Sequence, residues 1–157
     1  MKKLESVEEL DLNGCVRITS MALGEALGSL VNLTSLDVSY CPRILSSSWQ
    51  GKVNSLKSLE LCYAGVRDSH VSNLRSLPML EELNLDSCIV GDSGIAHLAD
   101  NNVMPNLTTL DLADTNITDV AMTKIAQFKE MRHLSLFYCN ISNRGTFWAL
   151  RNDLQCT

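Results

Sequence analysis

The sequence lacks a long apolar run, a block of like charges and any excess of basic residues. No stretch approaches the roughly 18 consecutive apolar residues that a membrane-spanning helix needs. Lysine and arginine together number 13 against 18 acidic residues, and the formal charge is −5. Because nucleic-acid binding draws on clustered Lys and Arg, we expect neither a membrane nor a nucleic acid as a partner.

The N-terminus also lacks the apolar segment of a secretory signal. Met1, Lys2 and Lys3 supply positive charge, but no apolar core follows them. We therefore expect a cytoplasmic or nuclear location. In that environment the six cysteines are expected to stay reduced rather than to form disulfides.

A nine-residue phrase, L-x-x-L-x-L-x-x-C/N, recurs six times. The copies read VEELDLNGC, LTSLDVSYC, LKSLELCYA, LEELNLDSC, LTTLDLADT and MRHLSLFYC, and they start at Val7, Leu33, Leu56, Leu80, Leu107 and Met131. Their central leucines follow one another at intervals of 26, 23, 24, 27 and 24 positions. This spacing falls within the 20–29 residue period of leucine-rich repeats.

Each repeat is predicted to be a strand, a turn and a return helix. Leu83 and Leu85 would face the core while Asn84 between them faces outward, because side chains alternate along a strand. One more inward aliphatic residue follows each phrase: Ile18, Ile44, Val66, Val90, Ile117 and Ile141. Aspartates at helix N-cap positions precede apolar residues at helical spacing in three repeats: Asp68 before Val71 and Leu74, Asp92 before Ile95 and Leu98, and Asp119 before Met122 and Ile125.

The predicted fold is a single α/β domain over residues 1–157. It is a right-handed leucine-rich-repeat solenoid, or horseshoe, with a concave parallel β-sheet and convex helices, because no repeat can bury its own leucines alone. Residues 46–51 predict an irregular segment in the second repeat, and a truncated seventh repeat would start at Leu154. Phe147, Trp148 and Leu150 are candidates to cover the last repeat, and the alternative is that the chain is a fragment of a longer repeat array. Self-association through the ends of the solenoid is a further expectation.

With a cysteine at the ninth position and an I-T-D-like turn before the helix, the sequence resembles the cysteine-containing subclass of leucine-rich repeats over about Val7 to Leu150. This subclass occurs in the F-box receptors of ubiquitin ligases and in related plant and protist proteins. The resemblance implies the fold and a role in binding proteins. No F-box-like segment precedes residue 7.

The cysteines and histidines do not predict a metal site or a catalytic site. Cys15, Cys41, Cys88 and Cys139 occupy the ninth position and are interpreted as structural thiols that serve the loop backbone. Cys62 occupies the seventh position and should lie beside Glu60 and Asp86. The three histidines fall in different parts of the repeat, and none is near enough to Cys62 to act as a base. We expect no cofactor, no metal and no enzymatic activity.

The outward positions of each phrase are the third, fifth, seventh and eighth, and they carry acidic residues without basic ones. Eight of the 24 are acidic: Glu9, Asp11, Asp37, Glu60, Glu82, Asp86, Asp111 and Asp114. None is Lys or Arg. A concave surface of one sign predicts a basic protein partner. The alternative is that Asp is common at the fifth position of such repeats for reasons of edge solvation.

Aromatic residues are scarce, yet four of the eight fall on these outward positions. Tyr40, Tyr63 and Tyr138 are eighth residues and Phe137 is a seventh. Exposed aromatics are enriched at binding hot spots, and Tyr40 and Tyr63 should touch because their strands are adjacent. They could also pack on one another with no partner. The leading prediction is a protein-interaction module, with a ubiquitin-ligase or signalling adaptor and a segment of a longer repeat array as alternatives.

Overall fold

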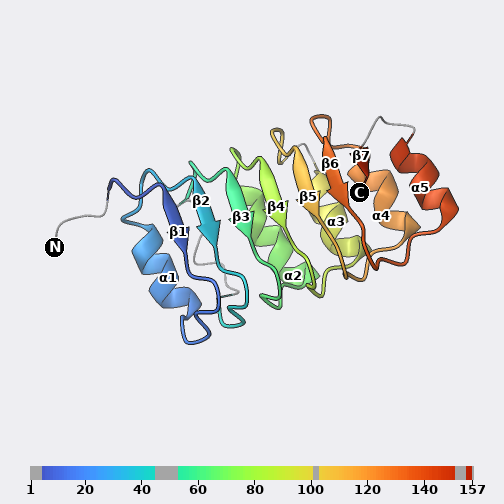
Figure 1. The fold of residues 1–157 in the computed structure, drawn as a ribbon. Helices are drawn as coiled ribbons and strands as arrows, with labels where there is room; N and C mark the ends of the chain where they lie inside the picture. The colour runs from blue at the N-terminus through green and yellow to red at the C-terminus, as the bar shows by residue number, and fades with distance from the viewer. Residues whose placement is uncertain (1–4, 45–52, 101–102, 151–154, 157) are drawn as a thin grey trace.

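The chain forms one parallel sheet backed by a layer of helices (Figure 1). A computed structural model describes residues 5–44, 53–100, 103–150 and 155–156. The strands are β1 (Glu9–Asp11), β2 (Ser35–Asp37), β3 (Ser58–Glu60), β4 (Glu82–Asn84), β5 (Thr109–Asp111), β6 (His133–Ser135) and β7 (Gln155–Cys156). The helices are α1 (Ser20–Leu27), α2 (Asp68–Val71), the 3₁₀ helix η2 (Ser72–Ser76), α3 (Asp92–Ala99), α4 (Asp119–Ile125) and α5 (Asn143–Leu150).

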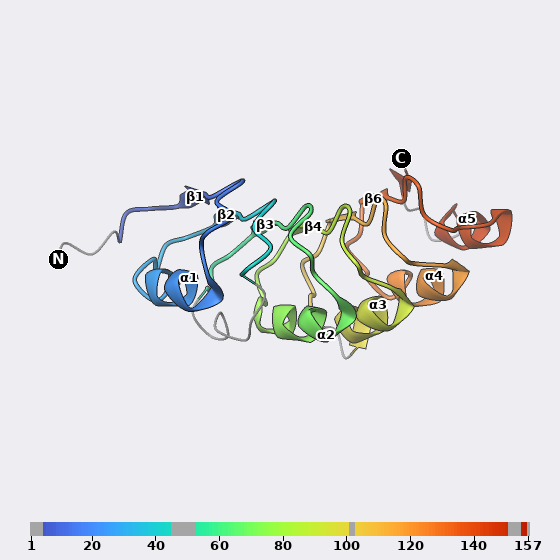
Figure 2. The ribbon, with the colours of Figure 1, turned by 90° about the horizontal axis from the view of Figure 1, so that it is seen from below.

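The strands follow one another across the sheet in chain order and in parallel. Figure 2 shows the strands and the helices as two layers, with a shallow curve that places the sheet on the inner side. The register pairs equivalent phrase positions, so Leu36 lies between Leu10 and Leu59. The structure confirms the predicted α/β leucine-rich-repeat solenoid.

The core is a continuous stack of the repeated aliphatic residues. Leu36, Leu59, Leu83, Leu110 and Leu134, the central leucines of repeats two to six, are fully buried. The first repeat is less covered, and its Leu10 and Leu12 are half-buried although they pack against the same core. The helices contribute the residues that their spacing predicted, since all six of Val71, Leu74, Ile95, Leu98, Met122 and Ile125 are buried.

The predicted N-cap role of the helix aspartates is wrong. Asp68, Asp92 and Asp119 are the first residues of α2, α3 and α4, and their carboxylates accept hydrogen bonds from the following repeat. Asp92 accepts from the backbone N–H of Thr118 at 2.8 Å and of Ala121 at 3.1 Å, so it caps the helix of its neighbour. The acid points along the solenoid rather than back onto its own helix.

The ninth-position thiols serve the loop backbone, as their position predicted, and they do so in the preceding repeat, so they also link repeats. The Sγ atoms of Cys41, Cys88 and Cys139 lie 3.1, 3.2 and 3.0 Å from the carbonyl oxygens of Leu12, Leu61 and Leu112 in the repeat before. The five cysteines whose side chains the structure describes are free thiols, and Cys41 and Cys88 are buried. Each thiol is thus a second donor to a carbonyl that already accepts a hydrogen bond within its own turn, from the N–H of Cys15, the N–H of Ala64 or the hydroxyl of Thr115.

Three expectations concern residues 46–51 and the C-terminal end of the chain. The irregular segment expected at 46–51 lies outside the described residues, as do Leu154 and the side chains of Trp148 and Leu150. Phe147 is 60% exposed, so it covers little of the last repeat. Gln155 of β7 pairs with His133, which is the third residue of its phrase. If Gln155 is also a third residue, its phrase starts one residue before Leu154. A seventh repeat starting at Leu154 stays a prediction.

Candidate binding face

The concave face consists of the third, fifth, seventh and eighth side chains of the six phrases. The strand register aligns the fifth positions into one row across the sheet: Asp11, Asp37, Glu60, Asn84, Asp111 and Ser135. Neighbouring strands lie about 4.8 Å apart. The carboxylate-bearing residues Asp11, Asp37 and Glu60 are therefore consecutive members of the row, where like charges repel one another.

The fifth-position aspartates have a structural role that the sequence did not reveal. Oδ1 of Asp11, Asp37 and Asp111 accepts the backbone N–H of the residue two positions later at 2.8–2.9 Å. The Oδ1 of Asn84 accepts the N–H of Asp86 at 2.8 Å in the same way. These Asx turns end the strands. Since the amide of Asn84 makes the same turn, the turn needs an oxygen but no charge.

The row contains two carboxylates whose pKa values move in opposite directions. Burial, with repulsion from Asp37, Glu82 and Asp111, raises the pKa of Glu60 despite a hydrogen bond from Asn84. Burial alone would also raise the pKa of Asp37, but hydrogen bonds from Ser39 and Asn13 outweigh it and lower the pKa. Ionisation of Glu60, in the middle of the row, is therefore disfavoured by burial and by the neighbouring carboxylates.

The eighth positions share an unusual backbone conformation at the end of the sheet. Tyr40, Tyr63, Ser87, Asp114 and Tyr138 have φ between 50° and 58°, and Gly14 has φ of 71° at the same position of the first repeat. This left-handed region costs a residue with a side chain about 1–2 kcal/mol. Glycine would be the unstrained choice, yet three of the six positions carry tyrosine.

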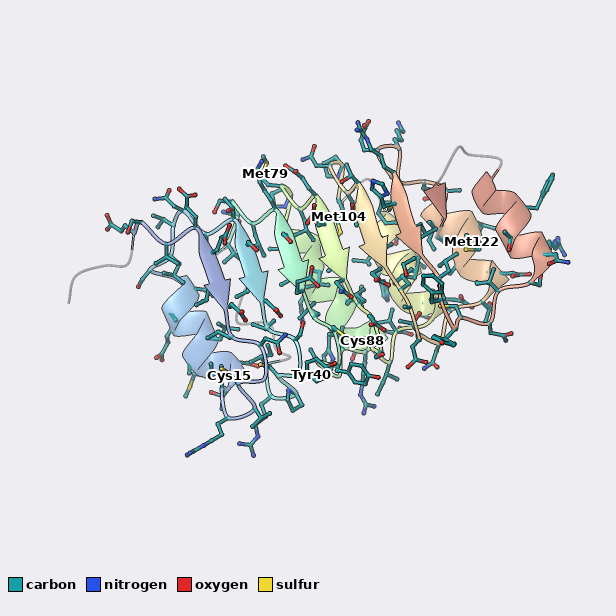
Figure 3. The ribbon with its side chains drawn as sticks, in the orientation of Figure 1. Cys15, Tyr40, Met79, Cys88, Met104 and Met122 are labelled. Atoms are coloured by element: carbon teal, nitrogen blue, oxygen red, sulfur yellow. The ribbon has the colours of Figure 1, made fainter. Side chains whose placement is uncertain are left out.

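Tyr40 and Tyr63 stack on each other as their adjacent strands predicted. Their ring centroids are 5.1 Å apart and the ring planes differ by 9°. Both side chains remain about half exposed, at 49% and 51%. Figure 3 places Tyr40 at the lower rim of the sheet, where the strands end. The pair therefore presents aromatic surface to solvent.

Cys62 and Asp86 lie next to this stack, as the sequence predicted for the seventh position. Their Sγ and Oδ2 atoms are 3.5 Å apart. Burial and the negative charge of Asp86 raise the pKa of Cys62 to about 12. Burial and the acidic groups of Cys62, Tyr63 and Asp86 also raise the pKa of Tyr40. The thiol is therefore a neutral hydrogen-bond donor at neutral pH, and this arrangement does not make it a nucleophile.

The second aromatic pair lies at the other end of the face. Phe137 is 58% exposed and Tyr138 is 91% exposed. Asp114 is exposed in the neighbouring repeat, and its backbone N–H donates to the carbonyl of Phe137 at 2.7 Å. The ten residues predicted for partner binding thus occupy one face. The Tyr40–Tyr63 pair and the Phe137–Tyr138 pair are not in contact, because two repeats lie between them.

The described residues contain no group of three or more His, Cys, Asp and Glu placed to hold a metal ion. Within the same ranges, no helix has both the length and the apolar character needed to cross a bilayer.

The repeated phrase and the stacked strand-helix units define a leucine-rich repeat protein. Residues 76–102 and 103–126 match the family model described as leucine-rich repeat. This match covers repeats in general, so the resemblance to the cysteine-containing subclass stays a prediction. No curated protein matches the chain by sequence.

Among solved structures, the chain is similar to internalin C2 of Listeria monocytogenes, with a TM-score of 0.69 and 22% identity over 98% of this chain and 75% of that one. An internalin designated inlF from the same bacterium gives a TM-score of 0.65 and 23% identity over 98% of this chain, which spans 47% of that one. The tropomodulin C-terminal domain of Caenorhabditis elegans gives 0.59 and 12% over 97% and 85%. At these identities the similarity defines the fold.

Proposed function

We propose that this protein is a non-catalytic module that binds a basic protein partner on its concave face. The observation that carries the proposal is the run of Asp11, Asp37 and Glu60, which the register places side by side on three consecutive strands. No Lys or Arg occupies any outward position of the six phrases. A cationic partner would relieve this repulsion and would be drawn to the face by its field.

The structural role of the fifth-position aspartates limits the possible explanations for their negative charge. The Asx turn accounts for an oxygen at the fifth position, which supports part of the edge-solvation alternative. It does not account for the charge, since Asn84 makes the same turn without one. Glu60 makes no such turn among the described hydrogen bonds, and its raised pKa reflects a carboxylate placed where burial and its neighbours disfavour ionisation. We attribute the excess charge to binding.

The isosteric replacement of aspartate by asparagine separates charge from turn. The triple variant Asp11→Asn, Asp37→Asn, Asp111→Asn should fold as the wild type does, because each amide oxygen can still accept the same N–H. A labelled peptide of alternating lysine and glycine serves as the basic probe. We expect the variant to bind it about tenfold or more weakly, since each exposed charge contributes up to about 1 kcal/mol. Equal affinity for both proteins would reject the proposal.

The alternative of a substrate-recognition adaptor for a ubiquitin ligase or a signalling complex rests on the subclass resemblance. Co-purification of the full-length protein with a cullin-type scaffold tests it. Recovery from native lysate without any ligase component would count against that role.

A further inference from the structure

The Tyr40–Tyr63 stack has two outer ring faces, and each is turned toward a repeat with a small eighth residue. In the eighth-position row the stack lies between Gly14 and Ser87. The centroid separation of 5.1 Å is close to the strand spacing of about 4.8 Å, so the rings stack along the solenoid. With Tyr40 on one side of Tyr63, the other face of Tyr63 is directed over Ser87.

Two carboxylates lie at the same place. The Ser87 hydroxyl is 2.8 Å from Oδ1 of Asp86 and 3.3 Å from Oδ2 of Asp114. A hydroxyl has one proton, so it can donate to only one of these acids at a time. Within the described ranges, neither carboxylate has a Lys or Arg partner; the ion pair found there joins Lys57 and Glu81. Unused acceptor positions therefore lie beside a tyrosine that is about half exposed.

From this arrangement, we infer that the partner places an arginine side chain on the outer face of Tyr63, with its guanidinium directed to Asp86 and Asp114. The inference rests on the proposed function and names the residue that the concave face selects. It predicts that the face distinguishes arginine from lysine, which a purely electrostatic surface would not do.

The chemistry of the two cations explains the selection. A guanidinium is flat, stacks on aromatic rings and presents several N–H donors in a fork that suits carboxylates. Because the next eighth residue after Tyr63 is the small Ser87, no aromatic ring continues the stack there, and a third planar group could follow Tyr63 at about one strand spacing. An ammonium group is also attracted to a ring face, but it is not planar, so it cannot stack on Tyr63 and present a fork of N–H donors to the two carboxylates at once.

The backbone conformation at Tyr63 favours glycine, which is consistent with a role for the aromatic ring at this position. Tyr63 has φ of 53°, where Gly14 occupies the equivalent position of the first repeat. The thiol of Cys62 donates to Oδ2 of Asp86 at 3.5 Å, so that carboxylate is held next to the stack. Position and hydrogen bonding thus fix both the ring and one of the two acids before a partner arrives.

Two labelled peptides test the inference with the whole chain, one of alternating arginine and glycine and one of alternating lysine and glycine. The wild type should bind the arginine peptide about 3- to 30-fold more tightly, which is the range for a cation over an aromatic ring. Tyr63→Asn, in which asparagine tolerates the left-handed backbone, should abolish that preference. Tyr63→Phe should keep it, and Met21→Ala, which removes a 72% exposed side chain on α1, should leave both affinities unchanged.

Equal affinity of the wild type for the two peptides would overturn the inference while the proposed function stands. The same holds if Tyr63→Asn weakens both peptides by one factor. Binding of neither peptide would instead reject the proposed function and the inference with it. Thermal unfolding of Tyr63→Asn and Tyr63→Phe, followed by circular dichroism, confirms that the compared proteins are folded.

Discussion

Asp92 of α3 is bound through both carboxylate oxygens to Thr118 of the next repeat. Oδ1 accepts the Thr118 backbone N–H at 2.8 Å, and Oδ2 accepts its hydroxyl at 2.7 Å. Asp119 repeats the pattern one repeat later with Ser142. A residue at the start of one helix thus fixes the start of the following one, and the convex side of the solenoid gains a chain of charged hydrogen bonds in addition to its apolar stack.

We predict that Asp92→Ala lowers the free energy of unfolding by about 2–3 kcal/mol, because hydrogen bonds to charged groups are strong and both the backbone N–H and the hydroxyl of Thr118 lose their acceptor. Urea denaturation of the purified variant measures this change. Ser93→Ala, an exposed substitution at the next position of α3, is the matched control and should change stability by less than about 0.5 kcal/mol. Equal effects of the two substitutions would contradict the inter-repeat cap.

Gly94 should be intolerant of even a methyl group. A Cβ atom there would lie 2.6 Å from Oδ1 of Asp68 and 2.8 Å from Cγ1 of Val90. We expect Gly94→Ala to destabilise the protein by about 1–2 kcal/mol, since overpacking outweighs the higher helix propensity of alanine. Gly28→Ala provides the contrast, because its Cβ would meet nothing closer than 3.5 Å. Thermal melts should place Gly28→Ala at or above the wild type and Gly94→Ala below it.

Cys62 should react slowly with alkylating reagents. With a pKa of about 12, its thiolate fraction at pH 8 is lower than that of an ordinary cysteine by a factor on the order of 10³. Mass spectrometry after a timed iodoacetamide pulse gives the rate at this residue, with a free cysteine-containing peptide as reference. Burial is the larger cause of the raised pKa and remains in the variant, but Asp86→Asn removes the negative charge that adds to it, so the reaction should accelerate. An unchanged rate in that variant would show that Asp86 does not control the thiol.

Glu60 should make the protein less stable as the pH rises. Its folded-state pKa is raised above the ordinary value of 4.5, so the folded protein binds more protons than the unfolded chain in the interval above 4.5. Stability is therefore lost as the pH rises from 4.5 through the folded-state pKa. Glu60→Gln should remove this loss and unfold at a higher temperature than the wild type at pH 7, with the difference shrinking below pH 4.5. Glu9→Gln, on the exposed edge strand, is the matched control for the removal of one negative charge from the concave face.

Much of the fold was predictable because the repeat encodes it locally. The period of two in each phrase places the leucines in the core, and the intervals between central leucines fix the stacking. The contact between Tyr40 and Tyr63 followed from the same logic, because equivalent positions of adjacent strands become neighbours. For the same reason, the residues of the concave face could be predicted from the sequence. The role of this face in binding stays a prediction.

The hydrogen bonds of the helix aspartates to the next repeat were not predictable from one repeat alone. The sequence predicts Asp92 as the N-cap of its own helix. Only the structure, in which Thr118 lies beside it, shows that its hydrogen-bond partner is 26 residues away. The Asx turns were also missed, because the fifth-position Asp could be explained by solvation without a specific partner. Gly14 did carry a signal for the left-handed eighth position, since glycine is favoured there, but five of the six phrases fill that position with other residues.

The salt dependence of peptide binding tests the central claim most directly. The dissociation constant of the lysine-glycine peptide is measured over a series of sodium chloride concentrations, for the wild type and for the triple variant Asp11→Asn, Asp37→Asn, Asp111→Asn. If the charge of the concave face binds the partner, wild-type affinity falls steeply with salt and the variant shows both weaker binding and a shallower slope, because fewer charges are screened. Superimposable curves for the two proteins would contradict the account.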